Sequence, residues 1–277
     1  MKAILLSVLT MLAGLAAAHA ADKTPAGYIT DIALTGADET AKTVVVRDGS
    51  EIAGKLMMPL YAGDVVFIRE PASAIGLETG SGKQVTLGAD LRRYPVEGQI
   101  DTGDSTWGIL GAISGVFAGE GDQAPENMVS KGGDLKMPMI VRGTNIIASG
   151  RKSLWLGWEG GTAPYTVSLA GEAGETVLVP DVAGTFTEVA LPETAGQRFT
   201  LVVKDARQTT VKVKIKADDG IDGMPEGQAQ RIAAAAKLTG QGKGEWTLEA
   251  AQLLRETKGG AAAALLEKIR TGWRLGG

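Results

Sequence analysis

The chain has 277 residues, with 28 Lys and Arg against 32 Asp and Glu and a formal net charge of −4. This mildly acidic balance, without an evident basic stripe, argues against nucleic acid as a partner. His19 is the only histidine, and there is no cysteine. Loss of His19 would exclude Ser-His-Asp and Cys-His catalysis, zinc sites built on imidazole or thiolate, and haem with a histidine ligand.

Residues 1–20, MKAILLSVLTMLAGLAAAHA, have the pattern of a secretory signal peptide. A positive charge at Lys2 precedes an apolar run that ends in the small-residue pattern Ala18-His19-Ala20. We expect cleavage after Ala20, which removes the histidine, and a periplasmic location. The apolar run is too short for a transmembrane helix and no other run is long enough, so we expect no transmembrane span.

Residues 21–97 are predicted to form a small β domain. The segment KTVVVRDG is a β-branched run ending in an Asp-Gly turn, and DVVFIRE is apolar on both faces. The segments SAIGLET and KQVTLG flank Gly80-Ser81-Gly82 and predict a hairpin. A phosphate-binding loop is disfavoured, because Leu77 and Gln84 occupy the positions where that motif needs glycine and Ser or Thr.

The order of these strands and turns resembles the FecR-type domain. The segments VVVRDG, PLYAGDVVFI and SAIGLETGSGKQVTLG follow one another as in that family. The matching positions are Leu60, Gly63, Asp64, Ser73 and the hairpin 80–87, which carries Gly-Ser-Gly where the family often has Asp-Gly. The resemblance covers residues 27–97 and implies a non-enzymatic, β-rich module associated with signalling or envelope assembly. It carries over no catalytic residue.

Residues 98–137 are predicted to be a glycine-rich connector with a short apolar helix that begins at Ser105 or Thr106. The candidates for one side of this helix are Trp107, Leu110, Ile113 or Ser114, and Phe117. Its glycines weaken it, so it needs contacts to persist. Two interpretations stay open: a helix packed between two β domains, or an exposed element that docks on a partner or membrane. In the second, Trp107 and Phe117 are candidate interaction residues.

Residues 138–217 carry strand patterns at the spacing of a β-sandwich. We expect about seven short strands, among them TVLV, RFTLVVK and TTVKVKIK, and an immunoglobulin-like architecture without its cysteine pair. In TTVKVKIK, Val211, Val213 and Ile215 face one way. Lys212, Lys214 and Lys216 face the other, which is typical of a sheet with one solvent-facing side.

The segment LWLGWEGGTAPYTVSL, residues 154–169, holds two of the five tryptophans. Strand alternation places one set of side chains in the predicted core, namely Leu154, Leu156, Trp158, Tyr165, Val167 and Leu169. We expect Trp158 to be the large central side chain. Trp155 points the other way and is the third candidate interaction residue, for contact with a partner or another domain.

Residues 218–277 are predicted to be an acidic linker followed by three short helices. The carboxylates of the linker, Asp218, Asp219, Asp222 and Glu226, do not have the spacing of a calcium-binding loop. The segments EGQAQRIAAAAKL, TLEAAQLLRETK and AAAALLEKIRTGW are separated by glycines. Short helices are marginal alone, so we expect them to pack on each other or on the sandwich.

The sequence as a whole predicts a mainly β protein that binds rather than catalyses. We assign no catalytic, cofactor-binding or metal-binding residue. The leading hypothesis is a periplasmic adaptor or sensor-type protein; its favoured partner is another envelope protein, with a cell-wall polymer as the second choice. Two alternatives stay open: a structural accessory that self-assembles through its helical tail, or a carboxylate-based glycan-processing enzyme. The candidate carboxylates of that enzyme are Asp101 with Asp104 and Glu120 with Asp122. A Ser-Lys hydrolase at SGRKS, residues 149–153, is disfavoured by its place in a predicted turn.

Overall fold

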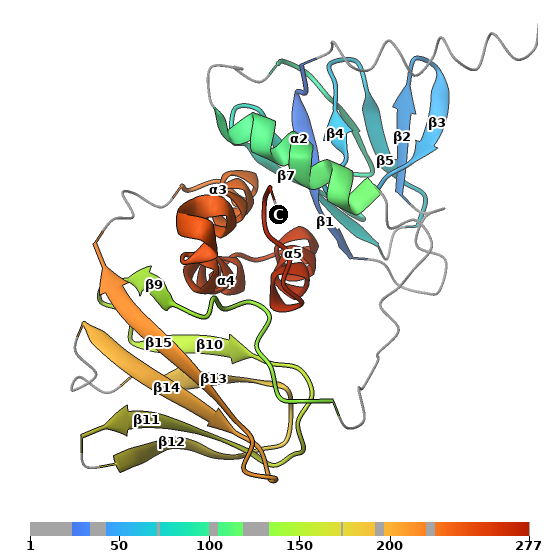
Figure 1. Ribbon diagram of the computed structural model, residues 1–277. Helices are drawn as coiled ribbons and strands as arrows, with labels where there is room; N and C mark the ends of the chain where they lie inside the picture. Colours follow the sequence, from blue (N-terminus) through green and yellow to red (C-terminus); the bar gives the residue numbers. More distant parts are fainter. Residues whose placement is uncertain are drawn as a thin grey trace, which may run out of the picture.

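The architecture, taken from a computed structural model, is two β modules with a block of helices between them (Figure 1). The structure describes residues 24–33, 43–70, 73–99, 105–118, 133–172, 174–191, 197–219 and 225–276. The prediction of a mainly β protein with C-terminal helices is confirmed. The predicted signal peptide lies outside the described residues.

The first β module, residues 24–99, consists of two four-stranded antiparallel sheets. One has the order β4 (Pro59–Leu60), β1 (Gly27–Ala33), β6 (Ala74–Thr79) and β7 (Gln84–Leu87). The other has the order β3 (Ser50–Ala53), β2 (Thr43–Arg47), β5 (Val65–Ile68) and β8 (Arg93–Pro95). Side chains from both sheets, among them Ile29, Val45 and Ile75, form one buried cluster. The predicted hairpin is confirmed, because Leu77 of β6 pairs with Val85 of β7.

The positions that carry the FecR resemblance have structural roles in this module. Asp64 is buried and accepts hydrogen bonds from the Arg47 guanidinium, at 2.7 Å from Nη2, and from the Tyr61 amide. Gly63 adopts a left-handed backbone in the preceding turn, with φ of 93°. Leu60 and Ser73 are buried. These residues therefore contribute to the turn before β5 and to the buried part of the module.

The second β module, residues 133–219, contains the seven strands that the sequence predicts. Five form a sheet in the order β12 (Gly174–Val182), β11 (Tyr165–Gly171), β14 (Arg198–Lys204), β15 (Thr210–Asp218) and β9 (Thr144–Ala148). β10 (Ser153–Gly157) pairs with β13 (Phe186–Ala190) in a second sheet. β9 runs parallel to β15, whereas the other strand pairs of this module are antiparallel.

The predicted core of this module is confirmed around Trp158. Its side chain is fully buried, and its ring meets the Tyr165 ring edge-on at 5.2 Å between centroids. The other predicted core residues are buried too, except that Leu169 is half-buried. The strands β10 and β11, which flank the turn 159–164, belong to different sheets. The turn therefore crosses from one sheet to the other.

The predicted helix in the connector is α2 (Ser105–Ala118). Its residues Leu110, Ile113 and Phe117 are buried, and the helix packs against α3 (Gln228–Gly240). The structure therefore agrees with the first interpretation, in which the helix packs within the chain. The main neighbour of α2, however, is α3 rather than the two β modules. The side chain of Trp107 lies outside the described part of the chain.

The three predicted C-terminal helices are confirmed as α3, α4 (Thr247–Glu256) and α5 (Gly260–Arg270), with the short 3-10 turn η2 (Gln241–Gly244) between the first two. We call them the helical block. Figure 1 shows the block between the two β modules. One hydrophobic cluster runs from Tyr28 and Met57 of the first module through the block into the second module. In the part of the chain that the structure describes, no helix is long and apolar enough to cross a membrane.

The first β module supplies the caps of two helices in the block. Gly227 and Gly259, which precede α3 and α5, have no side chain that could cap. The Ala229 amide instead donates to Glu78 Oε2 at 2.8 Å, and the Gly260 amide donates to Asp31 Oδ1 at 2.7 Å. Carboxylates at helix N-termini satisfy free amides and meet the positive end of the helix dipole. These contacts anchor both helices on the sheet that contains β1 and β6.

Glycine at position 227 leaves room for the Glu78 carboxylate at the start of α3. A Cβ atom there would lie 2.5 Å from Glu78 Oε1, which is closer than any real contact of that kind. A side chain at this position would push the Glu78 carboxylate away from the start of α3. Gly227 therefore provides no side-chain cap of its own, and it leaves room for the Glu78 carboxylate of the first module to cap α3.

Replacing Glu78 with glutamine should change how stability depends on pH. Burial raises the pKa of Glu78, although the amides at the start of α3 and the Gln84 side chain oppose the shift. A carboxyl group with a raised pKa favours folding most below the pKa of the unfolded chain, about 4.3, and this contribution is lost as the pH rises through the raised value. The wild type should therefore lose stability relative to Glu78→Gln as the pH rises from about 4 through the raised pKa of Glu78. Urea unfolding of both proteins across this range measures the difference; a constant difference would contradict the assignment.

The second β module is held by polar residues of α4. Glu249 is fully buried and accepts hydrogen bonds from the Ala148 amide and from Arg151, at 2.9 Å and 2.7 Å. Gln252 accepts from the Trp155 amide and donates to the Trp155 carbonyl, at 2.7 Å and 2.9 Å. The helical block is therefore joined to both modules by buried hydrogen bonds.

Candidate functional site

Two of the three candidate interaction residues are buried inside the chain. Phe117 is 7% exposed and Trp155 is 8% exposed. The Trp155 ring lies 6.2 Å from the ring of Phe186, and its backbone binds α4. The Trp155 backbone therefore contacts the helical block, whereas its ring packs against Phe186 of the same module. Only Phe186 of this pair, at 57% exposure, reaches the surface.

The candidate catalytic groups give no site in the described residues. The carboxylates considered for glycan hydrolysis, Asp101, Asp104, Glu120 and Asp122, lie outside them. The segment 149–153 joins β9 to β10, as predicted, and the Ser153 hydroxyl donates to Glu188. Among the residues that the structure describes, no three His, Cys, Asp or Glu side chains gather to hold a metal ion.

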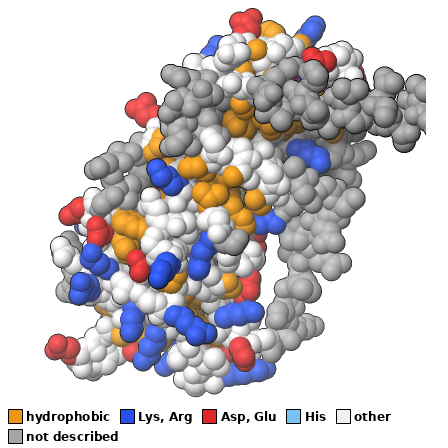
Figure 2. Space-filling model, turned by 45° about the horizontal axis from the view of Figure 1, so that its top comes forward, with side chains coloured by type: hydrophobic (Ala, Val, Ile, Leu, Met, Phe, Trp, Pro, Cys, Tyr) orange, Lys and Arg blue, Asp and Glu red, His pale blue; other side chains and the backbone are white. Residues whose placement is uncertain are grey.

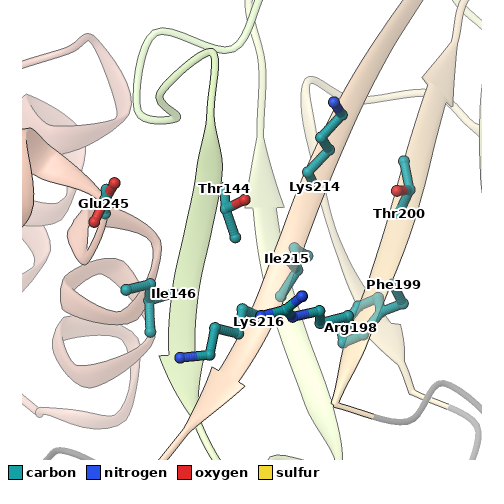
Figure 3. A pocket seen from close by; sticks show the side chains of 9 residues that line it. All are labelled: Thr144, Ile146, Arg198, Phe199, Thr200, Lys214, Ile215, Lys216 and Glu245. Atoms are coloured by element: carbon teal, nitrogen blue, oxygen red, sulfur yellow. The ribbon is translucent and has the colours of Figure 1, made fainter.

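An open depression of about 530 Å³ lies over strands β9, β14 and β15 of the five-stranded sheet. We call it the basic hollow. Figure 3 shows that its cationic side chains come from neighbouring strands β14 and β15, and that Glu245 lies beyond β9 at the start of α4. Its lining residues are Thr144, Ile146, Arg198, Phe199, Thr200, Lys214, Ile215, Lys216 and Glu245.

Strand alternation and register place the cations of the basic hollow on one face. Val213 and Ile215 of β15 are buried in the module, so Lys214 and Lys216 between and beyond them point outward. Residues two apart on a strand lie about 6.6 Å from each other. The pairing of β14 with β15 puts Arg198 directly opposite Lys216. Three cations therefore share one small area.

Most of this positive charge has no counter-charge in the structure. Lys216 pairs with Asp218, and Lys204 pairs with Glu175 at 3.7 Å. Arg198, Lys212 and Lys214 form no ion pair with any described residue. Figure 2 shows Lys and Arg side chains gathered over the lower part of the molecule.

Like charges that face each other across a strand pair destabilise a sheet. The pair formed by Arg198 and Lys216 is such a case, since only Lys216 has a carboxylate partner among the described residues. A bound anion would relieve this repulsion and form charge-assisted hydrogen bonds. The chemistry that the hollow offers is therefore anion binding.

The remaining wall of the hollow comes from the helical block. The Ile146 amide of β9 donates to the Glu245 carbonyl at 2.8 Å, which fixes the turn before α4 against the edge of the sheet. Thr144 and Thr200 add hydroxyl groups to the lining, and Ile146 adds a half-buried apolar side chain. The hollow thus combines cations, hydroxyls, an apolar surface and one carboxylate on a fixed framework.

The sequence indicated part of this site. The alternation of Lys212, Lys214 and Lys216 predicts the solvent-facing side of β15, but it does not by itself indicate a binding site. Arg198 and Glu245 come from distant segments, and nothing local connects them to that row. One signal in the sequence could have suggested a shared basic face. Arg198 begins the strand RFTLVVK, and the next strand along the chain, TTVKVKIK, has a lysine at every second position.

Comparison with known proteins adds no identification. No protein-family model matches the chain, and the search of curated proteins finds no relative.

Proposed function

We propose that this chain is an exported, non-catalytic binding protein of the adaptor type, and that the basic hollow is its contact surface. The export step rests on the signal-peptide pattern of residues 1–20, and cleavage after Ala20 leaves a periplasmic mature chain. The partner is another envelope protein or a cell-wall polymer that presents negative charge. The absence of histidine and cysteine from the mature chain supports a binding role over the commonest forms of catalysis.

One observation carries the proposal: cations without counter-charges converge on an open hollow. The whole chain has a net charge of −4, so this concentration is not a consequence of overall composition. Arg198 and Lys214 have no carboxylate partner among the described residues, although Asp218 and Glu175 neutralise their neighbours. Local charge of this kind steers an anionic partner to one face.

The two β modules fit the same role. We infer that the first is a FecR-type domain, on its order of strands and turns, and that the second is an immunoglobulin-like sandwich. The two packed sheets of the second module and the parallel pairing of β9 with β15 support the latter inference. In Figure 1 the modules lie on opposite sides of the helical block, so a partner at the hollow leaves the first module accessible to a second one.

The test is co-sedimentation of the mature chain with isolated envelope fragments at low salt. The wild type should sediment with them, and Arg198→Gln combined with Lys214→Gln should remain in solution. The enzyme alternative predicts a different result: turnover of wall fragments that Asp101→Asn or Asp104→Asn abolishes. Turnover with unchanged sedimentation of the double variant would contradict the binding proposal. The self-assembly alternative receives no support from the helices, because their apolar faces are already buried within the chain.

A further inference from the structure

We propose that the ligand of the basic hollow is an acidic glycan, a sugar chain that carries carboxylate or phosphate groups. This inference rests on the proposed function. Of the two partners considered there, it selects the polymer over the protein. It follows from what the hollow contains besides its cations.

Glu245 argues against a ligand that is only a polyanion. Glu245 is among the residues that line the hollow with Arg198, Lys214 and Lys216, and it forms no ion pair with a described residue. A carboxylate repels the phosphates of a nucleic acid or the side chains of an acidic peptide. It accepts hydrogen bonds from hydroxyl groups. A ligand with anionic groups on one side and hydroxyls on the other can bind the cations and the Glu245 side of the hollow at the same time.

The neutral part of the lining suits a sugar as well. The hydroxyls of Thr144 and Thr200 can each donate and accept, as sugar hydroxyls do. The side chain of Ile146 provides apolar surface for the C–H groups of a sugar ring. The volume of about 530 Å³ lies within the range of sites that hold small molecules, about 300–1,000 Å³. The hollow is open, so a longer chain can pass through it.

The binding of four defined polymers to the mature chain tests this inference. Polygalacturonate carries a carboxylate on each sugar, and phosphomannan carries phosphate on a sugar chain. Dextran has hydroxyls without charge, and inorganic polyphosphate has charge without sugar. We expect one or both acidic glycans to bind, dextran not to bind, and polyphosphate to bind more weakly at equal charge concentration. The better of the two glycans identifies the anionic group.

Three variants and one matched control locate the binding. Lys214→Gln should weaken binding of the better glycan about ten-fold, because a charge-assisted hydrogen bond is lost. Lys212→Gln removes the same charge from the same face of β15, outside the hollow, and should change affinity by less than about two-fold. Thr200→Val should weaken the glycan and leave polyphosphate unchanged. Glu245→Gln should weaken the glycan and strengthen polyphosphate, since it removes both the acceptor and the repulsion.

Circular dichroism of each variant shows that the fold is retained. Equal affinity for polyphosphate and the glycans, with Glu245→Gln strengthening all of them, would overturn the glycan inference in favour of a general polyanion surface. Failure of both glycans to bind, while envelope co-sedimentation still depends on Arg198 and Lys214, would also overturn it and leave the proposed function standing. Failure in both assays would remove both proposals.

Discussion

Replacing Glu249 with alanine should lower the free energy of unfolding by about 3–5 kcal/mol. The Glu249 side chain is fully buried and bridges α4 to the second β module through Arg151 and the Ala148 amide. Burial by itself would lower the pKa of Arg151, but its hydrogen bonds and charge interactions with Glu249 and Glu256 raise it. Without Glu249, the mostly buried guanidinium keeps only the half-exposed carboxylate of Glu256, and the Ala148 amide loses its acceptor. Breaking a buried pair on one side is costly because a buried charge is left without compensation.

Glu256→Ala is the matched control for this substitution. Glu256 binds the same Arg151 from the surface, where its side chain is 56% exposed. Surface ion pairs contribute about 0–1 kcal/mol, so its loss should be barely measurable. Urea unfolding followed by tryptophan fluorescence compares the two variants. Similar losses for Glu249→Ala and Glu256→Ala would mean that Glu249 does not brace the helical block against the sheet.

Trp158→Ala should destabilise the protein by about 3–5 kcal/mol and unfold the second β module first. Among the described residues, Trp158 has the largest fully buried side chain, and its ring packs against Tyr165. Its removal leaves a cavity that neither sheet can fill, because Leu154 and Leu156 are fixed in adjacent strand positions. Near-ultraviolet circular dichroism and thermal unfolding measure the loss.

Trp155→Ala tests the neighbouring position with the same change of residue. The backbone hydrogen bonds between Trp155 and Gln252 do not need the Trp155 side chain. The buried Leu154 and Leu156 on either side place the Trp155 ring on the opposite face of β10. We expect the module to stay folded and α4 to loosen. Hydrogen exchange at the amides of Leu253 and Leu254 should then rise. If both tryptophan variants unfold the module to the same extent, the distinct role assigned to Trp155 is wrong.

Features that depend on nearby residues were predictable from the sequence. The β6–β7 hairpin, the seven strands of the second module and the three C-terminal helices follow from alternation, helical periodicity and glycine positions. The burial of Trp158 follows from the same alternation. Each of these patterns is complete within about twenty residues, so no knowledge of the tertiary structure is needed.

The position of the helical block was not predictable, because its anchors lie far away in sequence. Glu78 and Ala229 are 151 positions apart, and Asp31 and Gly260 are 229 positions apart. The glycines before α3 and α5 mark helix starts without saying which residues cap them. The basic hollow has the same origin, since strand pairing and the docking of the block bring Arg198 and Glu245 to the lysines of β15.

The central claim is that this chain binds an anionic envelope component through the basic hollow. Its most direct test is co-sedimentation with envelope fragments of two double variants that lose the same charges. One carries Arg198→Gln and Lys214→Gln inside the hollow; the other carries Arg207→Gln and Lys212→Gln outside it. The account predicts that only the first variant stays in solution. Equal loss of sedimentation in both, or in neither, would contradict it.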